Sequence, residues 1–375
     1  MRVKISRTGI FIQLMFGLLA LFSAPLISAA PLDRIKLPAG FSISYFAEHV
    51  QGARSLALGE QGTVFVGNRN GDSIIALVDE DSDGVAENRY VIGEYLDTPN
   101  GIAFYKGALY VAENQRIIRF PDIEQRLDDP PEPEVVFDAL PDERHHGWRY
   151  LAIGPEGYLS VAIGAPCNIC NKPLPFATVC RLKPDGGEFE VFAKGVRNSV
   201  GFTWHPETEA MWFTDNGRDW MGDDSPPDEL NRAGRKGLHF GYPFRHGANI
   251  PDPKFGRVAP NMAFEPPALE MGAHVAALGL RFYTGSMFPA AYKNRLFIAQ
   301  HGSWNRTTPV GYRIIAVTIE DGRASDKQVF AEGWLLGSIK WGRPVDVLVM
   351  PDGALLISDD MHGAVYRISY QHQGD

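Results

Sequence analysis

The sequence predicts an all-β fold, a six-bladed β-propeller, from three observations. After the first thirty residues no long helical periodicity is found, and the 375 residues include 39 glycines and 27 prolines. One pattern, an apolar strand followed by a tight turn and a second apolar strand, recurs six times. A period of about 50 residues that contains only strands is typical of propeller blades rather than of a helical solenoid.

The six units share a turn that in most cases contains Gly, Pro-Glu-Gly or Pro-Asp-Gly, which supply the backbone angles of a tight hairpin. The units span residues 55–66, 100–111, 150–161, 200–213, 280–298 and 345–357. The wide gap after Phe213 predicts a long insertion. An array of immunoglobulin-like domains is the alternative, but it predicts shorter units without the acidic residues that follow the second strand, as at 112–114.

The first thirty residues have the layout of a secretory signal, with a basic start, an apolar stretch over about residues 10–22 and small residues before the cleavage point. Cleavage after Ala29 fits best, so we assign 1–29 to a signal peptide and 30–375 to a single propeller domain. An uncleaved anchor is the alternative, although the apolar run is short for a span of about 20 residues. We expect a periplasmic or secreted protein without a stable membrane span.

The composition narrows the class of partner. The formal net charge is −9 and the chain has no run of basic residues, so nucleic acid is not an expected partner. The three cysteines, Cys167, Cys170 and Cys180, allow at most one disulfide within the chain in an oxidising compartment, and the sequence leaves open which pair forms it. Asn171 after Cys170 argues against covalent haem attachment. The sequence does not indicate an oligomeric state.

Four polar segments lie at the ends of the predicted hairpins. They are residues 143–149, 195–201, 215–231 and 301–306, and residues 342–346 open the sixth unit. The blades of a propeller converge on a central channel, and loops on one face bring residues from every blade together. The sequence therefore predicts that these segments are neighbours in space.

These segments resemble the soluble pyrroloquinoline-quinone (PQQ) dependent sugar dehydrogenases, and more closely their sorbosone-dehydrogenase-like branch, over essentially the whole chain after the signal. His145, four residues before Arg149, resembles the catalytic-histidine segment, and Arg197-Asn198 resembles the arginine–asparagine segment. The calcium loop of the family is matched by residues 215–217, 228–231 and 240–243, with an insertion. The order of these pieces across four blades is specific, whereas any single piece is weak.

The resemblance implies oxidation of an aldose-like or sorbosone-like sugar, in which a histidine takes the hydroxyl proton while hydride passes to a quinone carbon. Counting from Arg149, the base is His145, with His146 as the alternative, since neutral imidazole can accept a proton at neutral pH. Arg197 would stabilise charge on the reduced quinone or polarise the substrate oxygen, and Asn198 would hydrogen-bond the cofactor. Electrons would leave to a periplasmic quinone or cytochrome acceptor.

The resemblance also implies Ca²⁺. The backbone carbonyls of Gly217 and Arg218 align with the family's calcium ligands, and such an ion polarises the quinone carbonyl. Asp228, Glu229 and the backbone of Phe240 match a neighbouring structural calcium position. An acidic surface loop is the alternative interpretation of these residues.

The sequence departs from the family at positions that face the PQQ carboxylates. Arg343 matches one of two expected arginines, but the second position is Val345, and the expected lysine is replaced by Asn305 with Arg306 beside it. Arg306 and Arg313 are the candidate replacements for the missing cations. The departures are compatible with a branch difference, with weak PQQ binding or with loss of the cofactor.

Two patterns lie outside this resemblance. Residues 79–84 have the opening spacing of an EF-hand loop, but the twelfth position is Tyr90, so we expect at most a hairpin tip that binds Ca²⁺ loosely. His274, His301 and Trp304 are candidates for the channel wall or for ordinary blade packing.

Two other function classes stay open. A calcium-dependent lactonase-type hydrolase on the same fold needs carboxylate and asparagine ligands that converge on one channel metal, without an arginine–asparagine pair for a cofactor. A non-catalytic propeller that binds a glycan or a protein is the third hypothesis. The chain has no nicotinamide fingerprint and no Gly-x-Ser-x-Gly elbow.

Overall fold

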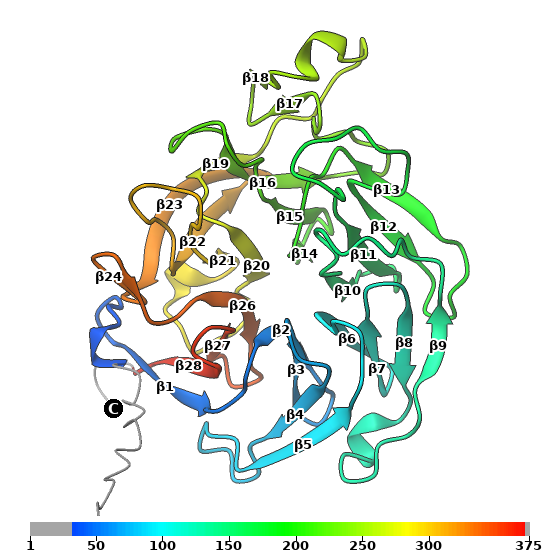
Figure 1. The fold of residues 1–375 in the computed structure, drawn as a ribbon. Helices are drawn as coiled ribbons and strands as arrows, with labels where there is room; N and C mark the ends of the chain where they lie inside the picture. The colour runs from blue at the N-terminus through cyan, green and yellow to red at the C-terminus, as the bar shows by residue number, and fades with distance from the viewer. Residues whose placement is uncertain (1–31, 372–375) are drawn as a thin grey trace, which may run out of the picture. The chain divides into compact units, whose positions relative to one another are not determined.

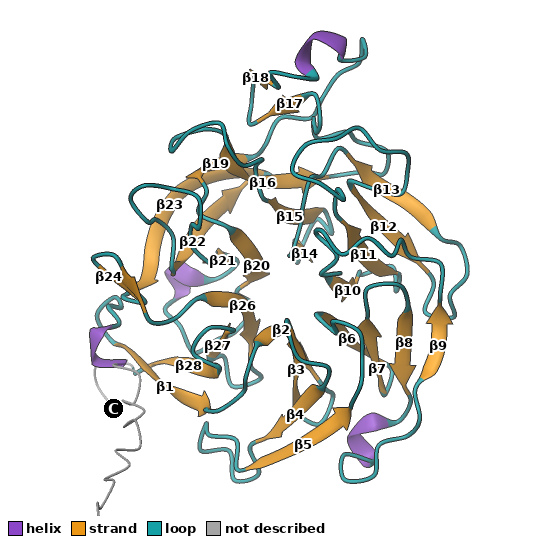
Figure 2. Ribbon diagram, viewed as in Figure 1, coloured by secondary structure: helices purple, strands orange, loops and turns teal. Residues whose placement is uncertain are grey.

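The computed structural model describes residues 32–371, so the predicted signal peptide, 1–29, lies outside the described residues. Six four-stranded antiparallel sheets are arranged around a central axis as the blades of a propeller (Figure 1), and the predicted fold class is confirmed. The helical elements of the described residues are 3₁₀ turns at Leu32–Arg34, Ile123–Gln125, Gly256–Val258 and Ala290–Tyr292 (Figure 2). None of the helices in this range is long and apolar enough to cross a membrane.

The first five blades each consist of strands numbered from the axis outward. The first contains β2 (Ala53–Leu58), β3 (Val64–Asn68), β4 (Ile74–Val78) and β5 (Asn88–Gly93). The second contains β6 (Gly101–Tyr105), β7 (Ala108–Ala112), β8 (Ile117–Phe120) and β9 (Glu134–Phe137). The third contains β10 (Leu151–Ile153), β11 (Leu159–Ile163), β12 (Thr178–Leu182) and β13 (Glu190–Lys194).

The fourth blade carries the predicted insertion. It contains β14 (Phe202–Trp204), β15 (Met211–Asp215), β16 (Pro227–Ala233) and β19 (Leu269–Ala273), and the hairpin of β17 (Arg245–His246) and β18 (Ile250–Pro251) lies between β16 and β19 in the chain. The fifth contains β20 (Ala277–Phe282), β21 (Leu296–Gln300), β22 (Arg313–Glu320) and β23 (Arg323–Glu332). A short hairpin, β24 (Leu335–Leu336) and β25 (Ile339–Lys340), follows it.

The sixth blade joins the two ends of the described chain. Strands β26 (Pro344–Val349), β27 (Leu355–Asp359) and β28 (Ala364–Tyr370) are completed by β1 (Phe41–Ala47), whose Phe41 pairs with Tyr370. The first strand in the sequence is therefore the outer strand of the last blade, and this pairing closes the ring.

The six repeated units of the sequence are the two innermost strands of the six blades. In the third blade, for example, Leu151 of β10 pairs with Val161 of β11 across a turn in which Gly157 has φ of 78°. Glycine adopts this left-handed conformation without the steric cost of a side chain. The inner strands are buried on both faces, as the all-buried pattern of β11 shows, because neighbouring blades pack on each of them.

The core is divided into apolar layers between adjacent blades. One layer joins the first and second blades through residues such as Phe65 and Phe120, and a larger one joins the fifth and sixth through Phe297 and Trp334. A small separate cluster of Val200, Leu278 and Val345 belongs to the innermost strands and their starts. Two of its members, Val200 and Leu278, also line the cavity described next.

Candidate active site

The loops that precede or follow the inner strands surround one cavity of about 420 Å³. Apart from Val200, Ala276 and Leu278, its lining comes from the four predicted polar segments, from residues 342–346, from the first blade and from His274. These lining residues are Arg54, Arg69, His145, His146, Trp148, Arg197, Asn198, Asn216, Gly217, Asp219, Asp228, His274, His301, Trp304, Asn305 and Arg343. The expectation that these segments are neighbours is therefore met. His274, His301 and Trp304 belong to the cavity wall.

The Arg197-Asn198 segment is fixed through its backbone by a buried carboxylate at the end of β15. The two oxygens of Asp215 accept hydrogen bonds from the amides of Arg197 (2.8 Å) and Asn198 (2.7 Å). Asp215 is 5% exposed. The fourth blade thus sets the position of the loop that enters it.

The guanidinium of Arg197 is fixed by the loop before it in the third blade. It donates to the backbone oxygen (2.9 Å) and side-chain oxygen (2.9 Å) of Asn168 and to the backbone oxygen of Asn216 (3.0 Å). It also pairs with Asp219 at 3.2 Å. Four donors with assigned partners leave this planar group little freedom, so it presents one fixed orientation to the cavity.

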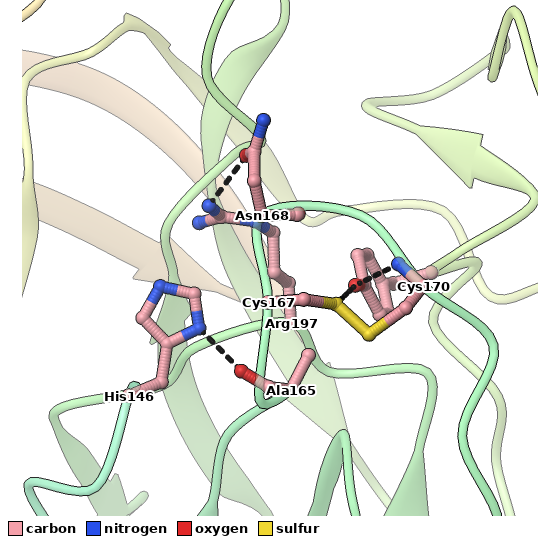
Figure 3. Close-up of a disulfide and its surroundings, with 7 residues drawn as sticks. His146, Ala165, Cys167, Asn168, Cys170 and Arg197 are labelled. Carbon is pink, nitrogen blue, oxygen red and sulfur yellow. Dashed lines mark hydrogen bonds between the residues drawn. A yellow bond between two sulfur atoms is a disulfide. The ribbon is translucent and has the colours of Figure 1, made fainter. Parts of the chain in front are cut away.

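A disulfide between Cys167 and Cys170 spans the loop that carries Asn168 (Figure 3). The backbone amide of Cys170 donates to the hydroxyl of Tyr242 at 3.0 Å. One intrachain disulfide agrees with the expectation from three cysteines. Cys180 is the free thiol; it is buried in β12, and burial raises its pKa to about 11.

The two adjacent histidines differ in how they are held. Nδ1 of His146 lies 2.7 Å from the carbonyl oxygen of Ala165 (Figure 3). A carbonyl only accepts hydrogen bonds, so Nδ1 carries the hydrogen and Nε2 is left as the acceptor. Within residues 32–371 no hydrogen bond of the His145 side chain is found, and its ring lies 4.1 Å from that of His146.

Both imidazoles are neutral at neutral pH. Burial, then the positive charge of Arg197, hold the pKa of His146 well below its usual value of 6.5. Burial and Arg197 also lower the pKa of His145, while Asp219 acts in the opposite direction. A neutral imidazole with a free Nε2 is the form that accepts a proton.

Buried carboxylates gather beside Gly217. Asp228 accepts hydrogen bonds from the amides of Gly217 (2.7 Å) and Ala276 (2.6 Å), and Glu229 accepts one from Gly247 (2.7 Å). Burial raises the pKa of Asp228 to about 6, and burial together with the charge of Asp215 raises that of Glu229 to about 8. Carboxylate and carbonyl oxygens are the donors that a hard divalent cation takes, but Glu229 is not a lining residue, and both oxygens of Asp228 accept hydrogen bonds from backbone amides.

Several predicted site residues do not line the cavity. The guanidinium of Arg218 turns to Asp252 at 2.6 Å, although its predicted ligand is the backbone carbonyl. Phe240 packs against Phe213 in the core. Arg306 binds the backbone oxygen of Asp223 and the carboxylate of Asp224 (2.8 Å), away from the lining residues.

The structure also shows the surroundings of the positions at which the sequence departs from the PQQ-dependent family. Asn305 does line the cavity, and its amide donates to Asp219 at 2.9 Å. Val345 belongs to the apolar cluster of the inner strands. Arg313, one of the two candidate replacements, donates to Gln300 at 2.7 Å and is not a lining residue. Arg343 lines the cavity and donates to the backbone oxygens of His301 (3.0 Å) and Gly302 (2.6 Å).

Sequence reasoning missed two arginines of the first blade, Arg54 and Arg69. The repeat contained a signal for one of them. Counted back from the turn glycines at 62, 157 and 353, Arg54 occupies the blade position of Arg149 and Val345, and Val345 is the place where the family carries an arginine. No such repeat signal marks Arg69, which follows β3.

The EF-hand-like hairpin lies between β4 and β5. Carboxylate oxygens of Asp79, Asp81, Asp83 and Glu87 lie within 4.8 Å of one another. Several of these oxygens accept hydrogen bonds from amides of the same loop, for example that of Gly84 to Asp79 at 2.9 Å. The residues are not part of the cavity lining, and calcium binding at this tip stays a prediction.

A family model described as a domain of unknown function, DUF7133, matches residues 28–372. This chain belongs to the DUF7133 family. An uncharacterized protein of Borreliella burgdorferi is 33% identical over 378 residues, which cover 96% of this DUF7133 chain and 97% of the relative. The aldose sugar dehydrogenase YliI of Escherichia coli is 25% identical over 266 residues, 63% of each chain.

Solved structures with the same fold are similar to this DUF7133 protein over about nine tenths of its length. They include a calcium structure of a Trichoderma reesei carbohydrate-active enzyme of family AA12 (TM-score 0.78, 18% identity, 90% of this chain and 97% of that one). The holo PQQ domain of pyranose dehydrogenase from Coprinopsis cinerea has a TM-score of 0.76 at 17% identity, covering 89% and 97%. The PQQ-bound aldose sugar dehydrogenase of Streptomyces coelicolor has 0.64 at 19%, covering 90% and 100%. The fold implied by the resemblance is thus confirmed.

Proposed function

We propose that this DUF7133 protein is a periplasmic or secreted quinoprotein oxidoreductase that uses PQQ and Ca²⁺ to oxidise an aldose-like or sorbosone-like sugar. One observation carries the proposal. The histidine pair, Arg197-Asn198, Gly217 and Arg343 come from four separate segments, and all of them line one cavity of about 420 Å³.

The names of similar proteins support this proposal. The Escherichia coli relative is an aldose sugar dehydrogenase, and two structures of the same fold are described as PQQ-containing sugar dehydrogenases. A third structure contains calcium. Identity to the three solved structures is below 20%, so they bear on the fold, and the assignment of chemistry rests on the residues of the cavity.

The lining residues fit the two proposed cofactors. The cavity volume lies within the range of small-molecule sites, about 300–1,000 Å³. The guanidinium groups of its wall are suited to carboxylates, and PQQ, when bound, supplies a quinone that accepts a hydride. The carbonyl of Gly217, with Asp228 and Glu229 nearby, offers the oxygen donors that Ca²⁺ takes.

The chain's own residues supply the proton transfer and the orientation. In the proposed reaction Nε2 of His146 takes the proton of a sugar hydroxyl. The carbon that carries this hydroxyl loses a hydride to the quinone and becomes a carbonyl carbon. The hydrogen bond to Ala165 sets the tautomer for this step. Arg197 is positioned to stabilise negative charge on oxygen, and Asn198 to donate to the cofactor. His145, expected from spacing to be the base, is the neighbouring candidate.

The arrangement argues against a lactonase of this fold. Such a hydrolase needs a channel metal held by converging carboxylate and asparagine side chains. Asn305 of the cavity wall is instead hydrogen-bonded to Asp219, and Asn168, which is not a lining residue, is hydrogen-bonded to Arg197. Arg197 and Asn198, which line the cavity together with the two histidines, are the pair that the lactonase interpretation lacks.

Reconstitution of the purified protein tests the proposal. Apo-protein is loaded with PQQ and CaCl₂, and the quinone absorbance is followed after addition of aldoses. We expect the quinone to be reduced by at least one aldose, PQQ to raise the melting temperature, and EDTA to prevent both. Absence of reduction by every sugar together with absence of a thermal shift would contradict the proposal.

A further inference from the structure

The cavity is electrostatically divided. On the side of the third and fourth blades, Arg197 is paired with Asp219 at 3.2 Å, and Asp228 adds a second carboxylate. On the side of the first and sixth blades, three arginines, Arg54, Arg69 and Arg343, line the wall. The first side carries no excess of positive charge, and the second does.

Two of the three arginines share a single carboxylate, that of Asp360. Oδ2 of Asp360 lies 3.1 Å from Nη1 of Arg54 and 3.2 Å from Nη1 of Arg69. The other oxygen of Asp360 accepts from Nε2 of His301 at 2.8 Å. Within residues 32–371 the guanidinium of Arg343 donates to two backbone oxygens and lies over the ring of Tyr312. Three guanidinium groups line this end, and Asp360 is the one carboxylate of the described residues in ion-pair contact with them, so this end of the cavity is the more positive one.

Arg69 is the member best placed to bind a ligand. Its side chain is 30% exposed, whereas that of Arg54 is 4% exposed and also donates to Asn100. Nε of Arg69 is buried and has no hydrogen-bond partner among the described residues. Its guanidinium lies over the ring of Trp148, 5.2 Å from the centroid, which holds the planar group in place.

We propose that Arg69, with Arg54 and Arg343 beside it, forms the carboxylate-binding end of the cavity and so determines which way round the tricarboxylate quinone enters. The inference rests on the proposed function. Arg69 and Arg54 would supply the cations lost at Asn305 and Val345, a role that neither Arg306 nor Arg313 can fill from its position in the fold. The quinone carbonyls would then point to Arg197, Asn198 and His146.

The test is the affinity of the apo-protein for PQQ in the presence of CaCl₂, measured by calorimetry. Arg69→Gln removes the cation, and we expect the dissociation constant to rise about tenfold or more, which corresponds to about 1.4 kcal/mol. Arg69→Lys keeps the charge and should recover part of that loss. Arg119→Gln is the matched control, because Arg119 has a similarly exposed side chain (38%) and one ion pair, with Glu134; it should bind PQQ like the wild type.

A second ligand makes the result independent of the variant's stability. The trimethyl ester of PQQ keeps the ring system and removes the negative charges. Wild-type protein should bind the ester at least tenfold more weakly than PQQ, and Arg69→Gln should reduce this preference. Equal affinity of the wild type for PQQ and its ester, or an unchanged PQQ affinity in a folded Arg69→Gln variant, would overturn the inference. If the wild type binds no PQQ at all, the proposed function itself fails.

Discussion

At the scale of single residues, the cavity depends on side chains whose freedom has been removed by neighbours. His146 is held by Ala165 and Arg197 by Asn168, so the proposed base and the proposed charge-stabilising group are oriented before any ligand binds. Preorganised donors and acceptors are the main source of rate enhancement in reactions that develop charge. Substitution of His146 or Arg197 should therefore affect the reaction rate directly.

The two histidines can be separated by substitution. His146→Ala should reduce kcat by about 10²- to 10⁴-fold, the usual contribution of a general base, while PQQ binding is retained. His145→Ala should change kcat by less than about tenfold, since its ring has no fixed orientation. Steady-state kinetics of both variants, with PQQ affinity as the control, decide between them. A larger loss of kcat in His145→Ala than in His146→Ala would identify His145 as the base, as the sequence spacing indicates.

The pH profile follows from the lowered histidine pKa. Burial and the charge of Arg197 hold the pKa of His146 well below its usual value of 6.5. Since the neutral form is the base, kcat/KM should stay level as the pH falls from 8 through 6.5 and decline only below that value. A profile already at half its maximum at pH 6.5 or above would contradict this assignment.

The sequence indicated which polar segments form the site, but it did not indicate the hydrogen-bond and ion-pair partners of their side chains. Arg197 and Asn198 were recognised because they are adjacent in the chain. Arg54 and Arg69 were missed because their shared partner, Asp360, is about 300 residues away and only the closure of the ring brings it to them. Arg306 was proposed for its place next to Asn305, yet its side chain turns to Asp224.

At the scale of elements, the inner hairpins were predictable and the outer strands were not. An inner strand such as β3 is buried at every position, which gives a continuous apolar run. An outer strand such as β23 exposes most of its first seven residues, so its sequence resembles a loop. The loop with the disulfide is the element that connects local structure to the site, because it carries Asn168.

Removal of the disulfide tests this connection. In the double variant Cys167→Ser and Cys170→Ser the loop should loosen, and Arg197 should lose its defined orientation. The free energy of unfolding should fall by about 2 kcal/mol for so short a loop, and kcat should fall several-fold.

Cys180→Ala is the control for the disulfide variant. It removes a buried thiol outside the loop, so it should leave kcat unchanged even if the melting temperature drops. Unchanged kcat in the double variant would show that the loop positions Asn168 without the disulfide.

At the scale of the whole molecule, the ring is closed by strands from opposite ends of the sequence. Phe41 of β1 contacts Phe288, Phe330 and Tyr292 of the fifth blade with ring centroids 4.7, 5.0 and 5.2 Å apart. Phe41 thus packs the outer strand of the sixth blade against the fifth blade. The cavity requires both ends of the chain in place, since Arg54 lies in the first blade and its partner Asp360 in the sixth.

Phe41→Ala should therefore destabilise the whole ring. We expect a loss of about 2 kcal/mol, below the usual cost of a fully buried phenylalanine because Phe41 is half-buried. Val135→Ala, at a position 56% exposed on β9, should stay within about 0.5 kcal/mol of the wild type. Denaturant unfolding of both variants provides the comparison, and equal stability of the two would contradict the role of β1 in closure.

The most direct test of the account is a crystal structure of the protein with PQQ and Ca²⁺. We expect the quinone in the central cavity, with carboxylates at Arg69 and Arg343, carbonyls at Arg197 and Asn198, and the calcium ion beside Gly217. A cavity that stays empty at saturating PQQ, or a quinone bound elsewhere on the molecule, would contradict it.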